Sequence, residues 1–264
     1  MNEDSYDIDD WYDEGIELLK QGKFEDALTC FNKVLEMDPS DLMALYQKAS
    51  ILRNLKRHME EIDCYNKIIE IDSDEQDAWY NKGYILTFLK KFDPAIESFN
   101  KALELNPDDT EALLYKGLAL YSLGRFEEAR ECYEKIIMLE PDNKEAWFRI
   151  GMALGAIGKY EEALEYHERA IEIDPNFINA LFAKGMALNI LKRDEEAIEY
   201  YDRVIDLNPR HKQAWYTKGM AFGNLGKFNK AMECFNIALH IDPNYKEAHQ
   251  SKKELEELIE KQAK

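Results

Sequence analysis

The sequence predicts an all-α protein, a stack of antiparallel helix pairs, and three regularities of its 264 residues lead to this prediction. The four tryptophans, Trp11, Trp79, Trp147 and Trp215, are 68 residues apart, which is twice 34. Six of the seven prolines share one position of a 34-residue period. Small and apolar residues recur within each period at steps of three and four, the spacing of one helix face. Such a period indicates stacked helical units rather than one or two globular domains.

Counting in steps of 34 from residue 8 gives seven consecutive repeats without an insertion, and the positions named below refer to this count. The repeats are 8–41, 42–75, 76–109, 110–143, 144–177, 178–211 and 212–245. An acidic N-terminal tail, 1–7, precedes them. The segment 246–264 begins like an eighth first helix but lacks its core residues, and we expect it to be a charged capping helix that solvates the end of the stack.

The first helix of each repeat is predicted from positions four, eight and eleven, which lie on one face. Position four alternates between Trp and Leu, and position eight is Gly in six repeats and Ala49 in the second. A large ring at position four needs a small neighbour, and a small residue at position eight lets a second helix approach closely. Gly near position fifteen, as at Gly22 and Gly124, is expected to end this helix in a tight turn.

The second helix is predicted from positions twenty, twenty-four and twenty-seven. Position twenty is Ala in six repeats and Glu61 in the second, and position twenty-four is aromatic in six repeats and His167 in the fifth. Proline at position thirty-two ends this helix, because proline disfavours a helical residue before it. The residues that follow can cap the next helix, as at Ser40, Asp109 and Asn143.

On these residues the chain resembles the tetratricopeptide repeat family, whose signature is a Trp-Leu-Gly-Tyr first helix followed by Ala, Phe and Pro. The resemblance covers residues 8–245. It implies a right-handed superhelix (an α-solenoid) with the first helices on the concave face, and a role as a protein–protein interaction scaffold. Two positions depart from the family pattern: position seven is Lys instead of Leu in five repeats, and position eleven is Leu instead of an aromatic residue in six.

Composition narrows the class of partner. With 34 basic and 53 acidic residues the formal net charge is −19, so neither nucleic acid nor an anionic membrane is expected to bind. The N-terminus lacks the basic and apolar regions of a secretion signal, and no apolar run is long enough to cross a membrane. We therefore expect a soluble, cytoplasmic protein that binds a protein or peptide.

Catalytic and metal-binding patterns are missing from the sequence, and we expect neither enzyme activity nor a metal or cofactor. Cys30, Cys64, Cys132 and Cys234 share position twenty-three, on helices too far apart for a disulfide or a zinc site. The histidines show no metal-ligand spacing, and His167 is expected to be a buried ring that is hydrogen-bonded to a neighbour. The sequence has no phosphate-binding loop, dinucleotide fingerprint or nucleophile elbow.

A second stripe on the first helices, at positions five and nine, is the candidate binding groove. In the family, position nine faces the groove, so apolar residues there would face water unless a ligand covers them. Position five has an alternative role in packing against the adjacent repeat. The candidate groove residues are Tyr12, Tyr46, Tyr80, Tyr84, Leu114, Leu118, Phe148, Met152, Phe182, Met186, Tyr216 and Met220. Position two adds an acidic rim of Asp9, Asp77, Glu111 and Glu145.

Apolar anchors beside acids favour a peptide that carries apolar residues and Lys or Arg, bound in extended or helical form. Family members that hold the acidic tails of chaperones use Lys at position five and Asn at position nine; neither occurs here, which argues against that ligand. The alternative function is a structural, self-assembling repeat protein. A monomer or weak self-association is expected, and an enzyme or a single-stranded nucleic-acid binder is less favoured.

The repeat 42–75 is unusual, with Ala49, Glu61 and Ser73 where the other repeats have Gly, Ala and Pro. A buried, unpaired carboxylate would cost several kcal/mol, so either Glu61 pairs with Lys or Arg or the two helices splay. We expect a weak point there, with faster amide exchange in 42–75 than in 110–177.

Overall fold

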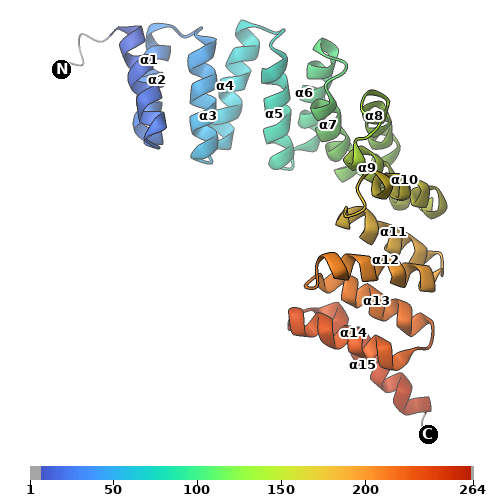
Figure 1. Cartoon of the computed structure of the whole chain (residues 1–264). Coiled ribbons are helices and arrows are strands. Elements are labelled where there is room, and N and C mark those ends of the chain that lie inside the picture. The colour runs from blue at the N-terminus through green and yellow to red at the C-terminus, as the bar shows by residue number, and fades with distance from the viewer. Residues whose placement is uncertain (1–6, 263–264) are drawn as a thin grey trace. The chain divides into compact units, whose positions relative to one another are not determined.

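Fifteen helices and no strand make up residues 7–262, the part of the chain that this computed structural model describes (Figure 1). They belong to two compact units, residues 1–124 and 125–264. The first unit contains α1 (Ile8–Lys20), α2 (Phe24–Met37), α3 (Leu42–Asn54), α4 (His58–Ile71), α5 (Gln76–Phe88), α6 (Phe92–Leu105) and α7 (Thr110–Ser122). The second unit contains α8 (Phe126–Leu139), α9 (Lys144–Ala156), α10 (Tyr160–Ile173), α11 (Ile178–Ile190), α12 (Asp194–Leu207), α13 (Lys212–Asn224), α14 (Phe228–Ile241) and α15 (Lys246–Gln262).

Each helix packs against the next helix along the chain within its unit, so the predicted fold class, an all-α solenoid of helix pairs, is confirmed. The odd-numbered helices α1 to α13 begin at the first position of each repeat and have 13 residues. In the second unit α9 also touches α11, and α11 touches α13, so these first helices share one face of the stack. The border between the units falls inside the predicted repeat 110–143.

The small residue at position eight makes room for the ring at position twenty-four. A Cβ atom added to Gly83 would lie 2.8 Å from the Phe99 ring, and one added to Gly185 would lie 2.6 Å from the Tyr201 ring. Interiors packed this closely leave no space for an extra carbon, so Gly lets the two helices of a repeat approach. The atoms nearest to the added Cβ belong to the second helix, so the expectation that this small residue lets the second helix approach is confirmed.

Position four has two different roles. The tryptophans are half-buried, and in Trp79, Trp147 and Trp215 the indole N–H donates to a backbone carbonyl of the preceding loop, as from Trp79 to Ser73 (2.9 Å). In α15, His249 occupies the same position, and its Nε2 lies 2.9 Å from the Pro243 carbonyl oxygen. The leucines at this position are instead buried in the core: Leu45, Leu113 and Leu181.

Position fifteen has a left-handed backbone in every repeat, where each first helix ends. The turn is stabilised by two backbone hydrogen bonds, for example from Gly22 N–H to Leu19 O (2.9 Å) and from Lys23 N–H to Leu18 O (3.0 Å). This Schellman arrangement favours Gly, because an L side chain at positive φ is strained. Three repeats nevertheless carry lysine there, at φ of 58 to 63°: Lys56, Lys90 and Lys192.

Four of the loops between repeats end in a residue whose side chain caps the following helix, namely Asp41, Asp109, Asn143 and His211, whereas Glu75 and Phe177 make no such hydrogen bond. Asp109 and Asn143 do so as predicted, each accepting a backbone N–H of its own helix at 2.9 and 3.0 Å. At the first junction the cap is Asp41, so the prediction for Ser40 is wrong. Ser40 lies one residue earlier and donates its hydroxyl to Asp38.

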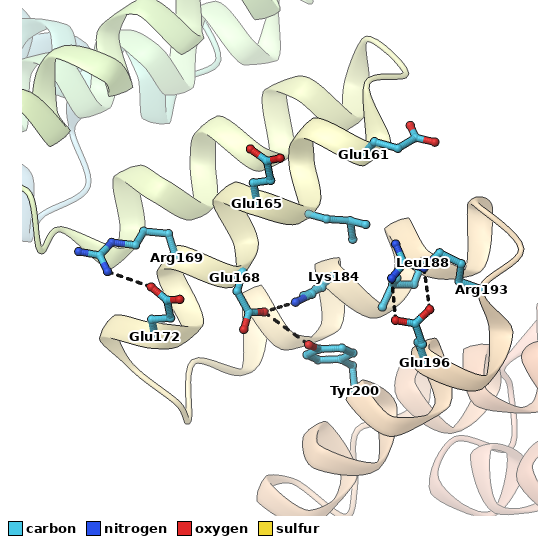
Figure 2. A pocket seen from close by; sticks show the side chains of 11 residues that line it. Glu161, Glu165, Glu168, Arg169, Glu172, Lys184, Leu188, Arg193, Glu196 and Tyr200 are labelled. Carbon is cyan, nitrogen blue, oxygen red and sulfur yellow. Dashed lines mark hydrogen bonds and ion pairs between the residues drawn. The ribbon is translucent and has the colours of Figure 1, made fainter.

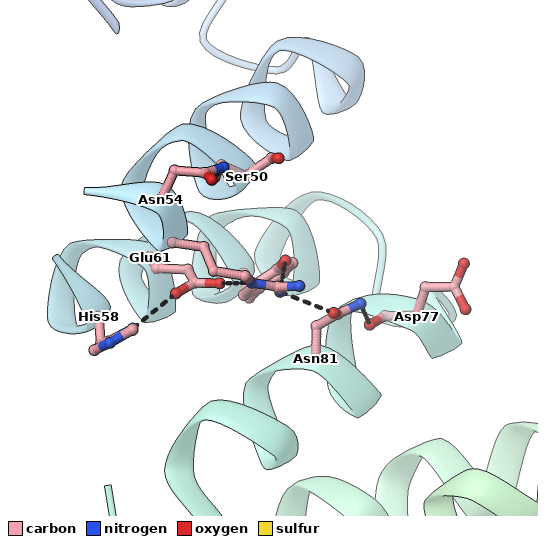
Figure 3. A network of polar contacts seen from close by, with 8 residues as sticks. Ser50, Asn54, His58, Glu61, Asp77 and Asn81 are labelled. Carbon is pink, nitrogen blue, oxygen red and sulfur yellow. Dashed lines mark hydrogen bonds and ion pairs between the residues drawn. The ribbon is translucent and has the colours of Figure 1, made fainter. Parts of the chain in front are cut away.

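Glu61 is fully buried between α3 and α4, and it is paired (Figure 3). Its carboxylate lies 2.6 Å from Arg53 Nε and 3.2 Å from His58 Nδ1. The same guanidinium donates to the Tyr65 hydroxyl at 3.0 Å and to Asn81 Oδ1 at 3.1 Å. Of the two alternatives for this residue, pairing with Arg is therefore the one present, and the carboxylate requires no splaying of the helices. The faster amide exchange of 42–75 stays a prediction.

At the end of the second unit, α15 buries one thin stripe and is charged elsewhere. Ala248 and Leu255 are buried, whereas Lys253 and Glu256 are exposed. This distribution fits the predicted capping role. At the other end, the predicted tail lies outside the described residues except for Asp7. The Asp7 carboxylate caps α1 by accepting the backbone N–H of Asp10 at 3.0 Å.

Candidate functional site

The position-five side chains of the predicted groove pack mainly inside the stack. Tyr12 meets the Phe31 ring edge-on, with centroids 5.3 Å apart, and Tyr46 meets Tyr65 at 6.1 Å. The Tyr46 hydroxyl also donates to Glu75 at 3.0 Å. Burial, followed by this carboxylate, raises the pKa of Tyr46 well above its usual range. These contacts are made within one repeat, against its second helix and the loop that follows, whereas the alternative role expected packing against the adjacent repeat. The position-five side chains are half-buried or, at Phe148, buried.

Position nine, in contrast, leaves apolar and aromatic side chains in water. Tyr84 is 37 % exposed, Met186 42 % and Met220 37 %. Leu118 and Met152 are half-buried. These residues lie on the first helices, one helical turn beyond the position-five side chains that pack in the stack, so both units present part of such a face.

In the first unit the exposed face is an aromatic cluster. The rings of Tyr84 and Tyr115 meet edge-on at 4.9 Å, and Tyr80 lies 6.5 Å from Tyr84 and 6.2 Å from Tyr115. Phe88, one turn beyond Tyr84 on α5, is 66 % exposed. Neither Tyr115 nor Phe88 is among the groove residues expected at positions five and nine. Phe88 could have been found, because its position is four beyond position nine and therefore on the same face.

In the second unit the exposed face is aliphatic. Ile190, one turn beyond Met186 on α11, is 47 % exposed. It is also absent from the expected groove, because it lies at neither position five nor position nine. Phe182 and Tyr216 pack against second helices: the ring centroids of Phe182 and Tyr201 are 5.9 Å apart, as are those of Tyr216 and Phe235.

In the predicted acidic rim, two carboxylates are bound by neighbouring side chains and two are exposed on the surface. Asp9 and Asp77 are exposed. Glu111 accepts the Tyr80 hydroxyl at 3.0 Å, and Glu145 pairs with Arg149 at 2.6 Å.

A separate charged cleft of about 560 Å³ lies on α10, α11 and α12 of the second unit (Figure 2). Its cations have partners within the chain: Lys184 lies between Glu168 and the Tyr200 ring, and Arg193 pairs with Glu196 at 2.6 Å. Lys184 is at position seven, which explains part of the departure from the family pattern. Because this cleft neutralises its own cations, it is a weaker candidate than the exposed first-helix face.

The thiols and the unusual histidine are buried and poorly suited to chemistry. All four cysteines are buried thiols outside any disulfide, and burial raises the pKa of Cys64 and Cys234 to about 11, which disfavours the reactive thiolate. Burial, with a smaller effect of Lys184, lowers the pKa of His167 to about 4. The predicted hydrogen bond of this ring is wrong, since the buried Nδ1 has no partner among the described residues.

Within residues 7–262, no three His, Cys, Asp or Glu side chains come together as a metal ion would need. None of the helices in that range is both long and apolar enough to cross a bilayer.

Comparisons with known proteins match almost the whole chain to one family. Four models described as tetratricopeptide repeat match it, and together they cover residues 12–143, 145–211 and 213–245. None of the curated proteins compared with the chain matches it in sequence.

Solved structures give the same result. YrrB, described as a tetratricopeptide repeat protein with an unusual peptide-binding site, is 26 % identical with a TM-score of 0.59, over 72 % of this chain and 97 % of YrrB. MamA is 26 % identical with a TM-score of 0.60, over 64 % of this chain and 92 % of MamA. A repeat protein from Cytophaga hutchinsonii, 17 % identical over 90 % of this chain and 98 % of its own, shares the fold with a TM-score of 0.74. The chain therefore belongs to the tetratricopeptide repeat family and, like that family, has the architecture of a protein-interaction scaffold.

Proposed function

We propose that this protein is a non-enzymatic scaffold that holds a peptide segment of another protein against the first-helix face of its repeats. The observation that carries the proposal is the exposure of Tyr84, Met186 and Met220 at position nine, while position eight of the same helices is buried. Tyr and Met suit a binding surface, since Tyr offers a rigid amphipathic ring and Met an adaptable one. The peptide-binding site named for YrrB adds support by similarity.

The proposed peptide carries apolar anchors flanked by Lys or Arg. The chain has a net charge of −19, and Asp9 and Asp77 are exposed beside the groove positions. Complementary charge would draw a basic peptide to this face and repel an acidic one. We also propose the cytoplasm as its location, because four cysteines outside any disulfide suit a reducing compartment.

Selection from a random peptide library displayed on phage, with the full chain immobilised, tests this function. We expect enriched sequences to combine apolar and basic residues. The dissociation constant of a selected synthetic peptide should rise about tenfold or more in the variant Tyr84→Ala/Met152→Ala/Met186→Ala, because lost apolar burial weakens binding.

The matched control is Met138→Ala, which removes an 82 % exposed methionine from a second helix and should leave the affinity unchanged. An unaltered affinity in the triple variant, with its helicity intact, would contradict the groove. Light scattering of the same samples separates peptide binding from the alternative of self-assembly, which predicts a mass that grows with concentration.

A further inference from the structure

An apolar cleft of about 220 Å³ lies at the end of the second unit, where α13, the start of α14 and α15 meet. Its apolar walls come from all three helices: Met220, Phe228, Phe235, Leu255 and Leu258. Met220 and Leu258 at its mouth are 37 % and 41 % exposed, whereas Phe235 and Leu255 at its base are buried. Met220 is also a candidate groove residue, so the cleft continues the exposed face of the first helices.

Gly223 keeps the cleft open. A Cβ atom added to Gly219, one turn earlier, would lie 2.6 Å from the Phe235 ring, so that glycine is needed for packing. A Cβ added to Gly223 would meet nothing within 4 Å. Gly is less favourable than Ala inside a helix, and the contacts within this chain give no reason for it at 223. Its effect is to remove a side chain from the cleft.

The size of the cleft suits one side chain. Sites for small molecules usually measure about 300–1,000 Å³ and enclose most of the ligand. This cleft is smaller and is open on one side, and its walls are mostly apolar carbon. A single Leu, Met or Phe side chain, presented by a peptide that continues along the exposed face, fits these properties.

Negative charge borders the cleft. Glu254 is the charged residue among those that line it. The lining residue Asn224 donates at 3.0 Å to Asp194, which is not itself among the lining residues. Asp194 is 5 % exposed and also accepts from Asn189 at 2.5 Å, and no cation pairs with it among the described residues. Glu254, the one carboxylate among the lining residues, together with the net charge of −19, favours a cation beside the apolar side chain.

We propose that this cleft binds one apolar side chain, Leu, Met or Phe, of a peptide in which the neighbouring residues are Lys or Arg. This inference rests on the proposed function and adds to it the place and the chemistry of an anchor.

Methyl NMR of the full chain, labelled at its methionine methyl groups, tests the anchor directly. The probe is acetyl-Lys-Lys-Leu-Lys-Lys-amide, and the same peptide with Ala for Leu is its control. The leucine peptide should shift the Met220 signal until it saturates, and the alanine peptide should bind about tenfold more weakly, because burying the larger side chain removes more apolar area from water.

The variant Gly223→Leu fills the cleft and should lower the affinity for the leucine peptide by about tenfold or more. Its control is Gly155→Leu, since Gly155 occupies the same position of the repeat 144–177 and also has nothing within 4 Å of an added Cβ. That control should keep the affinity within about twofold. Glu254→Gln should lower the affinity for the leucine peptide by about threefold and make that affinity less dependent on salt concentration. If Gly223→Leu does not fold, Leu258→Ser replaces it, because Leu258 is exposed at the mouth.

The outcomes separate the two proposals. If the Met152 and Met186 signals move with the leucine peptide while Met220 does not, the anchor is overturned and the groove stands. An equal affinity of Gly223→Leu and the unmodified chain also overturns the anchor. If no methionine signal moves, the anchor is overturned and the phage selection alone decides the groove.

Discussion

Two buried polar residues, Glu61 and His167, stand at positions that other repeats fill with Ala and with an aromatic ring. Their surroundings differ. Glu61 accepts from Arg53 and lies within reach of His58, whereas the buried nitrogen of His167 has no partner among the described residues. Each residue therefore affects stability in its own way, and each can be tested.

Arg53→Ala should destabilise the protein by about 2 to 3 kcal/mol, since it leaves the Glu61 carboxylate buried with only His58 beside it. We place the value below that of a fully buried pair because Arg53 is 44 % exposed. The double variant Arg53→Ala/Glu61→Ala should recover most of this loss, because it restores the usual small residue. Urea unfolding followed by circular dichroism measures both. A double variant as unstable as the single one would contradict this interpretation of Glu61.

His167 should make the protein sensitive to mild acid. Its pKa of about 4 in the folded chain lies below the value near 6.5 of an exposed histidine, so the unfolded chain binds more protons between these values. Stability from this residue is present above about pH 6.5 and is lost as the pH falls toward 4, by about 2 kcal/mol between pH 7 and pH 5. His167→Phe should remove this part of the pH dependence. Equal pH slopes of the two proteins in urea unfolding would show that another group is responsible.

At the scale of the helix pair, the left-handed residue at position fifteen is the strained element. Lys90 has φ of 58°, and the hydrogen bonds of its turn are those of the glycine turns. Lys90→Gly should stabilise the protein by about 0.5 to 1 kcal/mol, because relief of the strain exceeds the entropy that Gly loses on folding. The matched control is Gly124→Ala, which introduces the strain and should destabilise by a similar amount. Thermal unfolding checks both signs, and an unchanged or lower melting temperature for Lys90→Gly refutes the prediction.

The helix starts and the turns could be predicted from neighbouring residues, whereas the contact partner of the glycine at position eight could not. The helix starts and the turns are visible in the sequence because Gly, Pro and the spacing of apolar residues act within a few residues. The partner of the glycine at position eight could not be identified in the same way. It is the ring at position twenty-four, sixteen residues later, and only the packing of the two helices brings them together.

At the scale of the whole molecule, net charge should govern binding. With −19 formal charges, we expect a basic peptide to lose affinity roughly tenfold when salt rises from about 0.1 M to 1 M, since the Debye length falls from about 10 Å to 3 Å. A peptide with Gln in place of each Lys should bind more weakly and respond little to salt. Fluorescence anisotropy titrations give both constants. A salt response shared by the two peptides would mean that charge is not what selects the ligand.

The candidate site could be predicted only in part. Position nine was identified from helical spacing, and Tyr84, Met186 and Met220 are exposed on the first helices. Position five looked equivalent in the sequence, yet rings such as Tyr12 and Phe182 pack against the second helix of their own repeat. A stripe on a helix shows which residues share a direction, but not what lies in front of them.

Residue spacing and composition were enough to predict the all-α class, the 34-residue repeat, the helix ends and the acidic charge. The tertiary structure alone decided that Arg53 pairs with Glu61, that the ring of His167 is buried without a partner at Nδ1, and that Gly223 opens a cleft between α13 and α15. The physical reason is that these contacts join side chains on different helices. Their existence depends on how closely those helices pack, which residue spacing does not specify.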